Sequence, residues 1–468
     1  MSSISQNYAY ALEKIYKNVV MNSFSLSSFD NYIGMMESLQ SGVALSVRTA
    51  ITKYFEKLDN DYCESKNRKS KYYYSGIYTR TLVTVFGEIQ FNRRYYYPKD
   101  KSSEGFYYVD DLLDLPKYDC YDQIIKAMLM EEKSHHNFAE AGEIVSKKIS
   151  EYSGQNIIIS RQLVYNVFHN FDIDDEISDD DIIDAENLYI MLDEKYVHTH
   201  DYFIDDNPKP SDKMVKHAVI YTGKEKVGKN RYKLLNKHSF SSIDESLDLV
   251  KSVEEYVDKH FIIDSIKNII ISGDGASWIM SFNKDFNLVK NVNKFFALDV
   301  FHLGQAVCRI TTNNDSRKKL RELIDNNHKK EFINQCDELI NLLPDRKDKI
   351  ESNKDYIISR WTYIKNTKNA LFIGCPMESH ISHDLAKVLS RDPKGYSINN
   401  LAKHIKLRDL YLNKQNIKQI YLYSNNYIQI DKTPVVQERL ITSNFNLIEA
   451  PNNMASWEIV NGQDILKL

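Results

Sequence analysis

The spacing of hydrophobic residues changes within the first hundred residues from a helical period to a strand period. Residues 5–58 carry apolar side chains at intervals of three and four, which predicts a mainly helical start. Two short runs rich in β-branched and aromatic residues follow at 81–86 and 89–95. They flank Gly87-Glu88, a turn signal, so we predict a β-hairpin that turns at these two residues.

The helical period returns between residues 121 and 171. Two periodic segments are followed by a break at Ser153-Gly154 and by a third segment that begins after Ser160, a good N-cap residue. This outline resembles a helix-turn-helix, in which the first residues of the last helix, here Arg161 and Gln162, contact base edges. Many three-helix units share the outline without touching DNA, and that alternative stays open. The segments are 121–132, 138–149 and 161–168.

The second half of the chain alternates short apolar strands with helical segments. Three strands, a helix, a strand that ends in an Asp, another strand and another helix are the outline of an RNase H-like core. The residues after that core, 303–372, have an almost wholly helical pattern, which predicts an all-helical insertion. The predicted strands are 187–192, 196–200, 214–221, 231–235, 267–272 and 295–298, and the amphipathic helix is 243–259.

These patterns predict an α+β multidomain protein whose boundaries follow changes in charge and period. Between residues 172 and 184, eight of thirteen side chains are acidic, and such a run repels itself and stays solvated, so we place the main linker there. The expected parts are an N-terminal helical region at 1–65, a DNA-binding region at 66–171, the acidic linker at 172–186, the first part of the core at 187–302, the helical insertion at 303–372, the completion of the core at 373–424 and a C-terminal tail at 425–468.

Composition is that of an ordinary soluble globular protein, with 42% hydrophobic and 27% charged residues. Five scattered cysteines without CxxC spacing indicate a reduced compartment without disulfides or structural zinc. Cys375 lies near His380 and His383, but their spacing matches no standard zinc site. We find no signal pattern and no apolar stretch of about 18 residues, so we expect a cytoplasmic protein without a membrane partner.

The net charge of −4 conceals a basic segment. Residues 66–101 hold nine basic side chains against two acidic ones, with aromatic residues interleaved. Basic groups neutralise phosphates and aromatics stack on bases, so the hairpin is a candidate nucleic-acid surface, with Arg80, Arg93 and Arg94 as candidate contacts. A solvated hairpin with a half-buried tyrosine face is the alternative. A turn-rich basic loop adds Arg391 as a further candidate contact.

Acidic residues stand at the ends of three predicted strands, at Asp193, Asp274 and Asp299. Neighbouring strands that bring carboxylates to one edge of a sheet can build a divalent-metal site, because Mg²⁺ and Mn²⁺ prefer such oxygen ligands. Two other interpretations stay open: Gly-Asp-Gly around Asp274 is ordinary turn chemistry, and Asp299 is a suitable N-cap for a helix that carries His302. Glu378 opens a later helix, where the helix dipole alone would favour it.

Five phrases, TVFGEIQFNRRYYY, YIMLDEKYV, IIISGDGASWI, LDVFHL and ESHISHDLAKVLSRDPKGYS, occur in this order over about residues 81–397. In order and spacing they resemble the ISLre group of bacterial insertion-sequence transposases. The chain is more distantly similar to the Mutator-like transposases, whose second catalytic Asp is followed by a Cys/Asp-x-x-His signature. Tyr396 stands where the last motif of the group usually has Trp.

The resemblance implies a DDE transposase, an enzyme that cuts and transfers DNA strands by phosphoryl transfer with two Mg²⁺ or Mn²⁺ ions. Asp193, Asp274 and Glu378 would be the catalytic, metal-binding carboxylates. Asp299 and His302 would form the Asp-x-x-His signature beside them, and Asp299 is the alternative to Asp274 as second carboxylate.

The same resemblance implies the partners and the compartment. The partners would be double-stranded DNA, namely the terminal repeats of the element and its target, handled by a homo-oligomer in the bacterial cytoplasm and on the nucleoid when bound. Two other functions stay open, a non-catalytic DNA-binding repressor derived from a transposase and a structure-selective RNase H-like nuclease. Acidic residues at all three catalytic positions argue against the first, and the helix-turn-helix outline argues mildly against the second.

Overall fold

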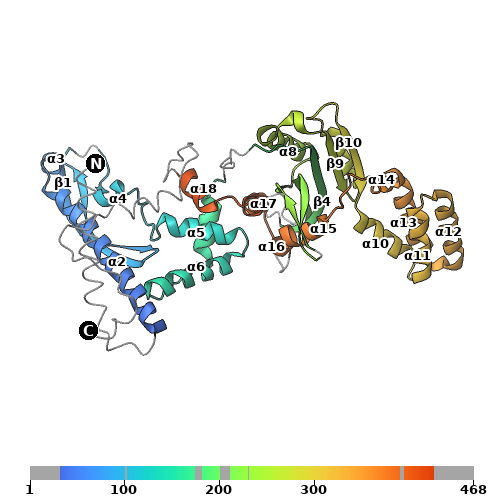
Figure 1. Cartoon of the computed structure of the whole chain (residues 1–468). Helices are drawn as coiled ribbons and strands as arrows, with labels where there is room; N and C mark the ends of the chain where they lie inside the picture. Colours follow the sequence, from blue (N-terminus) through green and yellow to red (C-terminus); the bar gives the residue numbers. More distant parts are fainter. Residues whose placement is uncertain are drawn as a thin grey trace, which may run out of the picture.

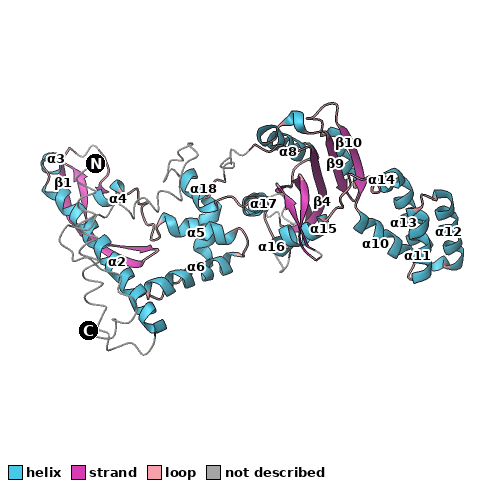
Figure 2. Ribbon diagram, viewed as in Figure 1, coloured by secondary structure: helices cyan, strands magenta, loops and turns pink. Residues whose placement is uncertain are grey.

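The computed structural model describes residues 32–100, 103–173, 182–200, 211–229, 231–390 and 395–425 as an elongated molecule of mixed α and β structure (Figure 1). A helical part with a hairpin forms one end, a sheet with its covering helices lies in the middle, and a group of helices forms the other end (Figure 2). No helix in these ranges is both long and apolar enough to cross a membrane. Residues 1–31, Arg391 and nearly all of the predicted tail lie outside the described residues.

The first end is built on a long helix packed against a three-stranded sheet. Ile51, Phe55 and Leu58 of the helix meet Leu82 and Phe91 of the hairpin, which explains why one face of each hairpin strand is apolar. The elements are α2 (Tyr32–Glu64), α3 (Lys66–Lys71), β1 (Tyr72–Thr84), β2 (Gly87–Pro98), β3 (Phe106–Tyr107) and α4 (Tyr108–Leu112).

The hairpin turns at residues 85–86, so the predicted turn at Gly87-Glu88 is wrong by two residues. Thr84 pairs with Gly87 across the ladder, and the Thr84 hydroxyl accepts a hydrogen bond from the Phe86 amide. Gly87, the first residue after the turn, has a φ of 105°, a conformation that residues other than glycine rarely adopt.

Three capped helices follow at the predicted places. They are α5 (Gln123–Lys133), α6 (Phe138–Ser153) and α7 (Arg161–Asn170). Asn137 and Glu140 form a capping box at the start of α6, and Gly154 ends it in a left-handed conformation. The predicted N-cap Ser160 is confirmed, because its hydroxyl accepts a hydrogen bond from the Leu163 amide.

The middle of the molecule is a mixed five-stranded sheet with the order β10-β9-β4-β5-β8. β10 and β9 run parallel to β4, whereas β5 pairs antiparallel with β4 and β8 pairs antiparallel with β5. The strands are β4 (Asn187–Thr199), β5 (Ser211–Tyr221), β8 (His238–Ser242), β9 (Asn268–Gly273) and β10 (Asn293–Leu298).

Three predicted strands of this sheet need correction. β4 does not end at residue 192 to return at 196–200; it runs on to Thr199, because Asp193 and Glu194 keep their backbone pairing with β5. The predicted strand 231–235 is β7 (Arg231–Leu235), which pairs with β6 (Gly223–Gly228) in a separate ribbon. The outer strand is instead β8, whose polar sequence HSFSS carries little apolar signal.

Helices cover both faces of the sheet. One face packs against α8 (Ser246–His260) and α9 (Ser277–Asp285), and the 3-10 turn Ile263–Ser265 leads from α8 to β9. The opposite face packs against α15 (Met377–His380), the π-helical turn Ile381–Ala386, α16 (Lys387–Leu389) and the first half of α17 (Ile398–Leu412).

A group of helices with its own core extends from the end of β10. Trp361, 6% exposed, packs there with Phe332, Cys336 and Ile350, as expected of an anchor residue. The helices are α10 (Val300–Ile310), α11 (Asn314–Asp325), α12 (Lys329–Leu342), α13 (Lys347–Ser359) and α14 (Trp361–Asn366), with a 3-10 turn at Pro344–Arg346.

A candidate metal centre at the edge of the mixed sheet

Alternation along β4 decides on which face Asp193 lies. Leu188 and Ile190 pack beneath α8 and α9, whereas Tyr189 and Met191 pack on the opposite face, with α15. Successive side chains of a strand point to opposite faces, so Asp193 continues the second set. Its carboxylate is therefore on the face that α15 covers, and the residue is 7% exposed.

Three elements bring Asp193, His302 and Glu378 together. Their ligand atoms all lie within 4.8 Å of one another. His302 Nε2 lies 3.9 Å from Asp193 Oδ2 and 4.0 Å from Glu378 Oε2. The three residues belong to β4, α10 and α15, and more than 180 positions separate the first from the last. Tertiary structure thus gathers two of the three predicted carboxylates and the predicted histidine in one place.

Asp299 caps a helix and also lies beside His302. It is the N-cap of α10, because its Oδ1 accepts the Phe301 amide at 2.9 Å. Its Oδ2 lies 3.8 Å from His302 Nε2, and the residue is 1% exposed. Burial raises the pKa of Asp299 to about 6, against the lowering by the Phe301 amide and His302.

Asp274 directly follows β9, in a turn that is contacted by residues of the helical group after β10. Its Oδ1 accepts the Ala276 amide at 2.7 Å, so the turn chemistry foreseen for Gly-Asp-Gly is present. The Asp274 carbonyl accepts hydrogen bonds from Tyr356 Oη at 2.8 Å and from Arg360 Nε at 3.1 Å. Asp274 is not one of the three residues with mutually close ligand atoms, but it is near enough for its charge to raise the pKa of His302.

Tyr356 and Arg360 are residues that the sequence did not single out. Both come from the helical segment after β10, and the Arg360 guanidinium lies 4.1 Å from the centre of the Tyr356 ring. Arg360 Nη2 also donates to the Gly275 carbonyl at 2.7 Å. The helical group therefore positions the loop that carries Asp274, and no local pattern could have indicated this contact over about eighty residues of chain.

Electrostatics at the centre favour a cation. The Asp193 carboxylate raises the pKa of His302 against the opposing effect of burial, and Asp299 and Asp274 add to the rise. His302 Nε2 is buried and has no hydrogen-bond partner among the described residues. Closely spaced carboxylates, with a buried imidazole nitrogen within 4.0 Å of Asp193, Asp299 and Glu378, suit a divalent ion such as Mg²⁺ or Mn²⁺.

Glu194 is a further acidic residue near the centre. Because it follows Asp193 in β4 it points to the other face, where it accepts a hydrogen bond from Trp278 Nε1 at 2.7 Å. Burial raises the pKa of Glu194, and the charges of Asp274 and Asp193 raise it further, whereas the Trp278 hydrogen bond lowers it. Its adjacency to Asp193 was the only sequence signal for it.

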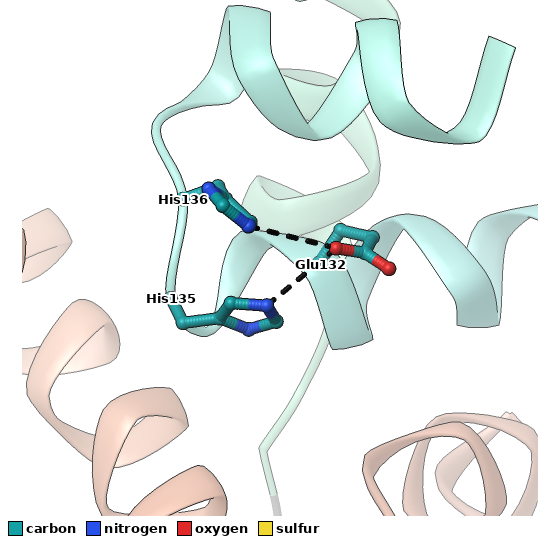
Figure 3. A group of neighbouring side chains, drawn as sticks. All are labelled: Glu132, His135 and His136. Atoms are coloured by element: carbon teal, nitrogen blue, oxygen red, sulfur yellow. Dashed lines mark ion pairs between the residues drawn. The ribbon is translucent and has the colours of Figure 1, made fainter. Parts of the chain in front are cut away.

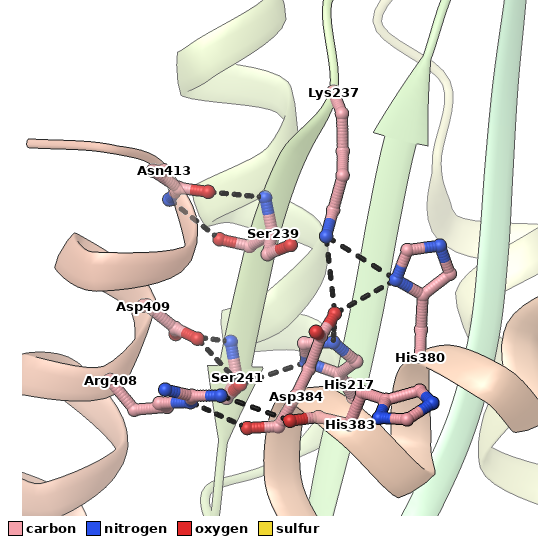
Figure 4. A network of polar contacts seen from close by, with 10 residues as sticks. All are labelled: His217, Lys237, Ser239, Ser241, His380, His383, Asp384, Arg408, Asp409 and Asn413. Carbon is pink, nitrogen blue, oxygen red and sulfur yellow. Dashed lines mark hydrogen bonds and ion pairs between the residues drawn. The ribbon is translucent and has the colours of Figure 1, made fainter. Parts of the chain in front are cut away.

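A buried polar network holds the helix that bears Glu378 (Figure 4). Asp384, six residues on, accepts Lys237 Nζ at 3.2 Å and lies 2.8 Å from His380 Nδ1 and 3.8 Å from the fully buried His217. His217 and its neighbour Ser241, 2.9 Å away, come from β5 and β8. Burial acts to raise the pKa of Asp384, but His217, His380 and Lys237 outweigh it and hold that pKa below its usual range.

Arg408 of α17 completes this network from the other side. The residues around Asp384 form a π-helical turn, which leaves carbonyl groups in need of donors. Arg408 Nε donates to the Asp384 carbonyl at 2.7 Å, and Arg408 Nη2 donates to the His383 carbonyl at 3.0 Å. The helix of Glu378 is thereby tied both to the sheet and to α17.

The arginines of the hairpin have internal partners. Arg80 is 6% exposed; it pairs with Asp110 and donates to the Pro116 and Asp119 carbonyls. The two remaining arginines are also engaged: Arg93 pairs with Asp110 at 2.8 Å and Arg94 with Asp59 at 2.6 Å.

The remaining candidate contacts lie elsewhere. Arg161 and Gln162 are exposed at the start of α7, where Gln162 Nε2 donates to Asn166 Oδ1 at 2.8 Å. Arg391 lies outside the described residues. Cys375, His380 and His383 are not among the groups of close metal-ligand atoms in the described ranges.

The chain belongs to the family described as Uncharacterised protein family (UPF0236), whose model matches residues 30–424. A UPF0236 protein of Caldanaerobacter subterraneus subsp. tengcongensis is 29% identical over 381 residues, which cover 80% of this chain and 77% of the relative. Another UPF0236 protein of that bacterium, named for eleven loci, is 26% identical over 422 residues, which cover 88% and 84%.

A solved structure adds a weaker likeness. It is the Drosophila P element transposase strand transfer complex, 13% identical, with 70% of this chain and 87% of that chain covered. The TM-score is 0.23, too low to define a common fold.

Proposed function

We propose that this protein is the DNA transposase of an insertion sequence and acts through a DDE site. The observation that carries the proposal is the convergence of Asp193, Glu378 and His302 from distant parts of the chain, at the positions that the ISLre-group motifs mark as functional. Asp274 and Asp299, at the ends of two adjacent parallel strands, extend the acidic edge.

The sheet supports an RNase H-like core for this enzyme. Three antiparallel strands that are neighbours in the sheet, β4, β5 and β8, are followed by two parallel strands, β9 and β10, on the other side of β4. This arrangement sets the first strand in the centre and brings the ends of β9 and β10 beside Asp193. The order of strands follows the predicted outline, except that 187–192 and 196–200 form the single strand β4 and β8 replaces the predicted strand 231–235.

In this proposal Asp193, Asp274 and Glu378 would hold two divalent ions. The ions supply charge stabilisation and an activated nucleophile when bound. The carboxylates place them, Asp299 caps α10 and so aims His302 at the site, and the Asp384 network anchors the helix that carries Glu378. Tyr356 and Arg360 hold the Asp274 loop in place.

The genomic distribution of the relatives gives independent support. One relative carries a name that joins eleven loci of a single bacterium. A gene that multiplies within one genome is expected of a mobile element, and a transposase is the protein such an element must encode. The exposed start of α7, with Arg161 and Gln162, supplies a surface for DNA on the other half of the molecule.

Cleavage of a labelled duplex that carries the sequence flanking the gene tests the proposal. Wild type, Asp274→Asn and Asp299→Asn are compared in Mg²⁺, Mn²⁺ and EDTA, with the exposed Asp325→Asn as control. We expect metal-dependent nicking at the element end, reduced at least about a hundredfold in Asp274→Asn and kept in Asp325→Asn, with DNA binding unchanged. Loss in Asp299→Asn but not in Asp274→Asn would reassign the second carboxylate.

Other outcomes would favour the alternative functions. Binding without cleavage in any metal would indicate a repressor, and equal cleavage of unrelated duplexes would indicate a structure-selective nuclease. An Asp193→Asn variant that cuts as well as wild type would refute the proposed centre altogether.

A further inference from the structure

A second group of metal-ligand side chains lies at the end of α5. Glu132 is in the last turn of the helix, and His135 and His136 follow in the turn that leads to α6. The ligand atoms of the three residues lie within 4.8 Å of one another. Figure 3 shows both imidazole rings directed at the same carboxylate.

The distances suit a tetrahedral transition metal. His135 Nε2 lies 3.5 Å and His136 Nε2 3.8 Å from Glu132 Oε2. Two ligand atoms of tetrahedral zinc are about 3.3 Å apart, since zinc bonds to nitrogen and oxygen are near 2.1 Å. Small movements of the side chains would therefore place all three atoms around one ion.

The second nitrogen of each ring has a partner of the kind that metal-binding histidines use. His135 Nδ1 lies 3.1 Å from Ser134 Oγ, and His136 Nδ1 lies 3.6 Å from Glu140 Oε2. Such partners orient the ring and fix which nitrogen faces the metal. Here both contacts leave Nε2 free to face Glu132.

The residues around Glu132 engage one oxygen of its carboxylate, and the two histidines remain partly exposed to solvent. Lys148 pairs with Glu132 Oε1, the oxygen that faces away from the histidines, so Oε2 remains for a metal. The Glu132 side chain is 9% exposed, whereas those of His135 and His136 are 24% and 33% exposed. A water molecule can thus supply a fourth ligand from solvent.

We propose that Glu132, His135 and His136 form a binding site for a divalent transition metal, with zinc as the favoured ion and water as the fourth ligand. The site is separate from the proposed DDE centre in position and in chemistry, because two imidazoles and one carboxylate favour zinc over Mg²⁺. The ring of His135 stacks on Tyr411 of α17 at 4.5 Å, so a metal here would stiffen the α5–α6 turn where α17 packs.

Zinc binding by the full chain tests this site. Protein stripped with a chelator is titrated with Zn²⁺ alone, and bound zinc is measured after gel filtration. Wild type and Glu378→Gln are compared with His136→Asn, and His169→Asn, an exposed histidine of α7, serves as the matched control. We expect His136→Asn to lose one equivalent of zinc that wild type, Glu378→Gln and His169→Asn all retain.

Glu140, which contacts the ring of His136, gives a second test that does not remove a metal ligand. Glu140→Gln keeps an acceptor for the capping box of α6, and we expect it to weaken zinc affinity by about 10–100-fold. Zinc should also raise the unfolding temperature of wild type but not that of His136→Asn. Equal zinc content and affinity in wild type and His136→Asn, with circular dichroism showing both folded, would overturn the site.

Discussion

At the scale of single residues, neighbouring side chains decide whether the pKa of a buried carboxyl group rises or falls. Asp110 and Asp384 are 6% and 7% exposed. Burial raises the pKa of Asp110 although Arg93 and Arg80 lower it, whereas the partners of Asp384 overcome burial and its pKa falls. Two aspartates of similar exposure thus have pKa shifts of opposite sign because His217, His380 and Lys237 together act on Asp384.

Asp122, the N-cap of α5, allows a prediction for pH dependence. Burial raises its pKa to about 6 from the ordinary value of 3.8, although the Ile125 amide opposes the rise. Between these values the folded state holds more protons than the unfolded state, so the free energy of unfolding falls as pH rises through this window. The cost is fully present above pH 6 and is at most about 3 kcal/mol.

Asp122→Asn keeps an oxygen for the cap and removes the ionisation. We expect the variant to be more stable than wild type at pH 7.5 and equally stable near pH 4, as measured by urea unfolding at each pH. Asp119→Asn, a nearby aspartate paired with Lys126, is the control and should not gain stability at pH 7.5. A gain for Asp122→Asn that is the same at both pH values would contradict the assignment.

At the scale of elements, the helix of Glu378 depends on a polar network rather than on helix propensity. α15 has four residues, and the π-helical turn after it has six, so neither is stable alone. Met377, Ile381 and Leu385 anchor one side in the core of the sheet, and Asp384 and Arg408 satisfy the polar groups on the other.

Asp384→Asn should therefore weaken both stability and the proposed cleavage. It leaves Lys237 and its two neighbouring histidines without a buried negative charge, for which the expected loss is about 3–5 kcal/mol near neutral pH. Because the pKa of Asp384 is lowered, its contribution is present above pH 3.8 and is lost as pH falls below that value.

Chemical unfolding at pH 7 and at about pH 3, where the Asp384 contribution begins to be lost, measures this effect, with Asp325→Asn as control. Asp325 pairs with Lys368 at 2.6 Å, but both side chains are about 60% exposed, so less than about 1 kcal/mol should be lost. Equal losses in the two variants would show that the Asp384 network is no stronger than a surface ion pair.

At the scale of the whole molecule, helix α17 belongs to two hydrophobic cores, that of the sheet and that of α5–α7. α17 places Leu401 and Ile405 in the core of the sheet and Leu407 and Leu410 in the core of α5–α7. α18 (Ile417–Ser424) then packs against α5. The segment 373–424, which we expected to complete the core of the sheet, also closes the N-terminal helical unit (Figure 1).

This connection predicts that a change near the end of the chain will loosen helices far before it. Ile420 is 1% exposed within the core of α5–α7, so Ile420→Ala should cost about 2–5 kcal/mol. Hydrogen exchange should show faster exchange in α5 and α7, and Ile158→Ala, 74% exposed in the same unit, should have little effect. Faster exchange confined to α18 would argue against a shared core.

Much of the local structure was predictable because its causes are local. Ser160 caps α7, Gly154 ends α6 and Asp299 caps α10 through contacts within a few residues. The period of apolar residues likewise placed β9 and β10 and the long helices correctly. β8 escaped prediction, because its strand state comes from pairing with β5 and not from its own polar sequence.

The sequence by itself determined most of the helices, the strands β9 and β10, several helix caps and the positions at which carboxylates stand. Only the tertiary structure decided which of them meet: it brought His302 between Asp193 and Glu378, turned Arg80 inward to Asp110 and joined α18 to α5. Helical hydrogen bonds, helix caps and side-chain periodicity act over a few residues, so they can be predicted from sequence. Contacts between distant side chains depend on how the packed elements are arranged, which a local pattern does not contain.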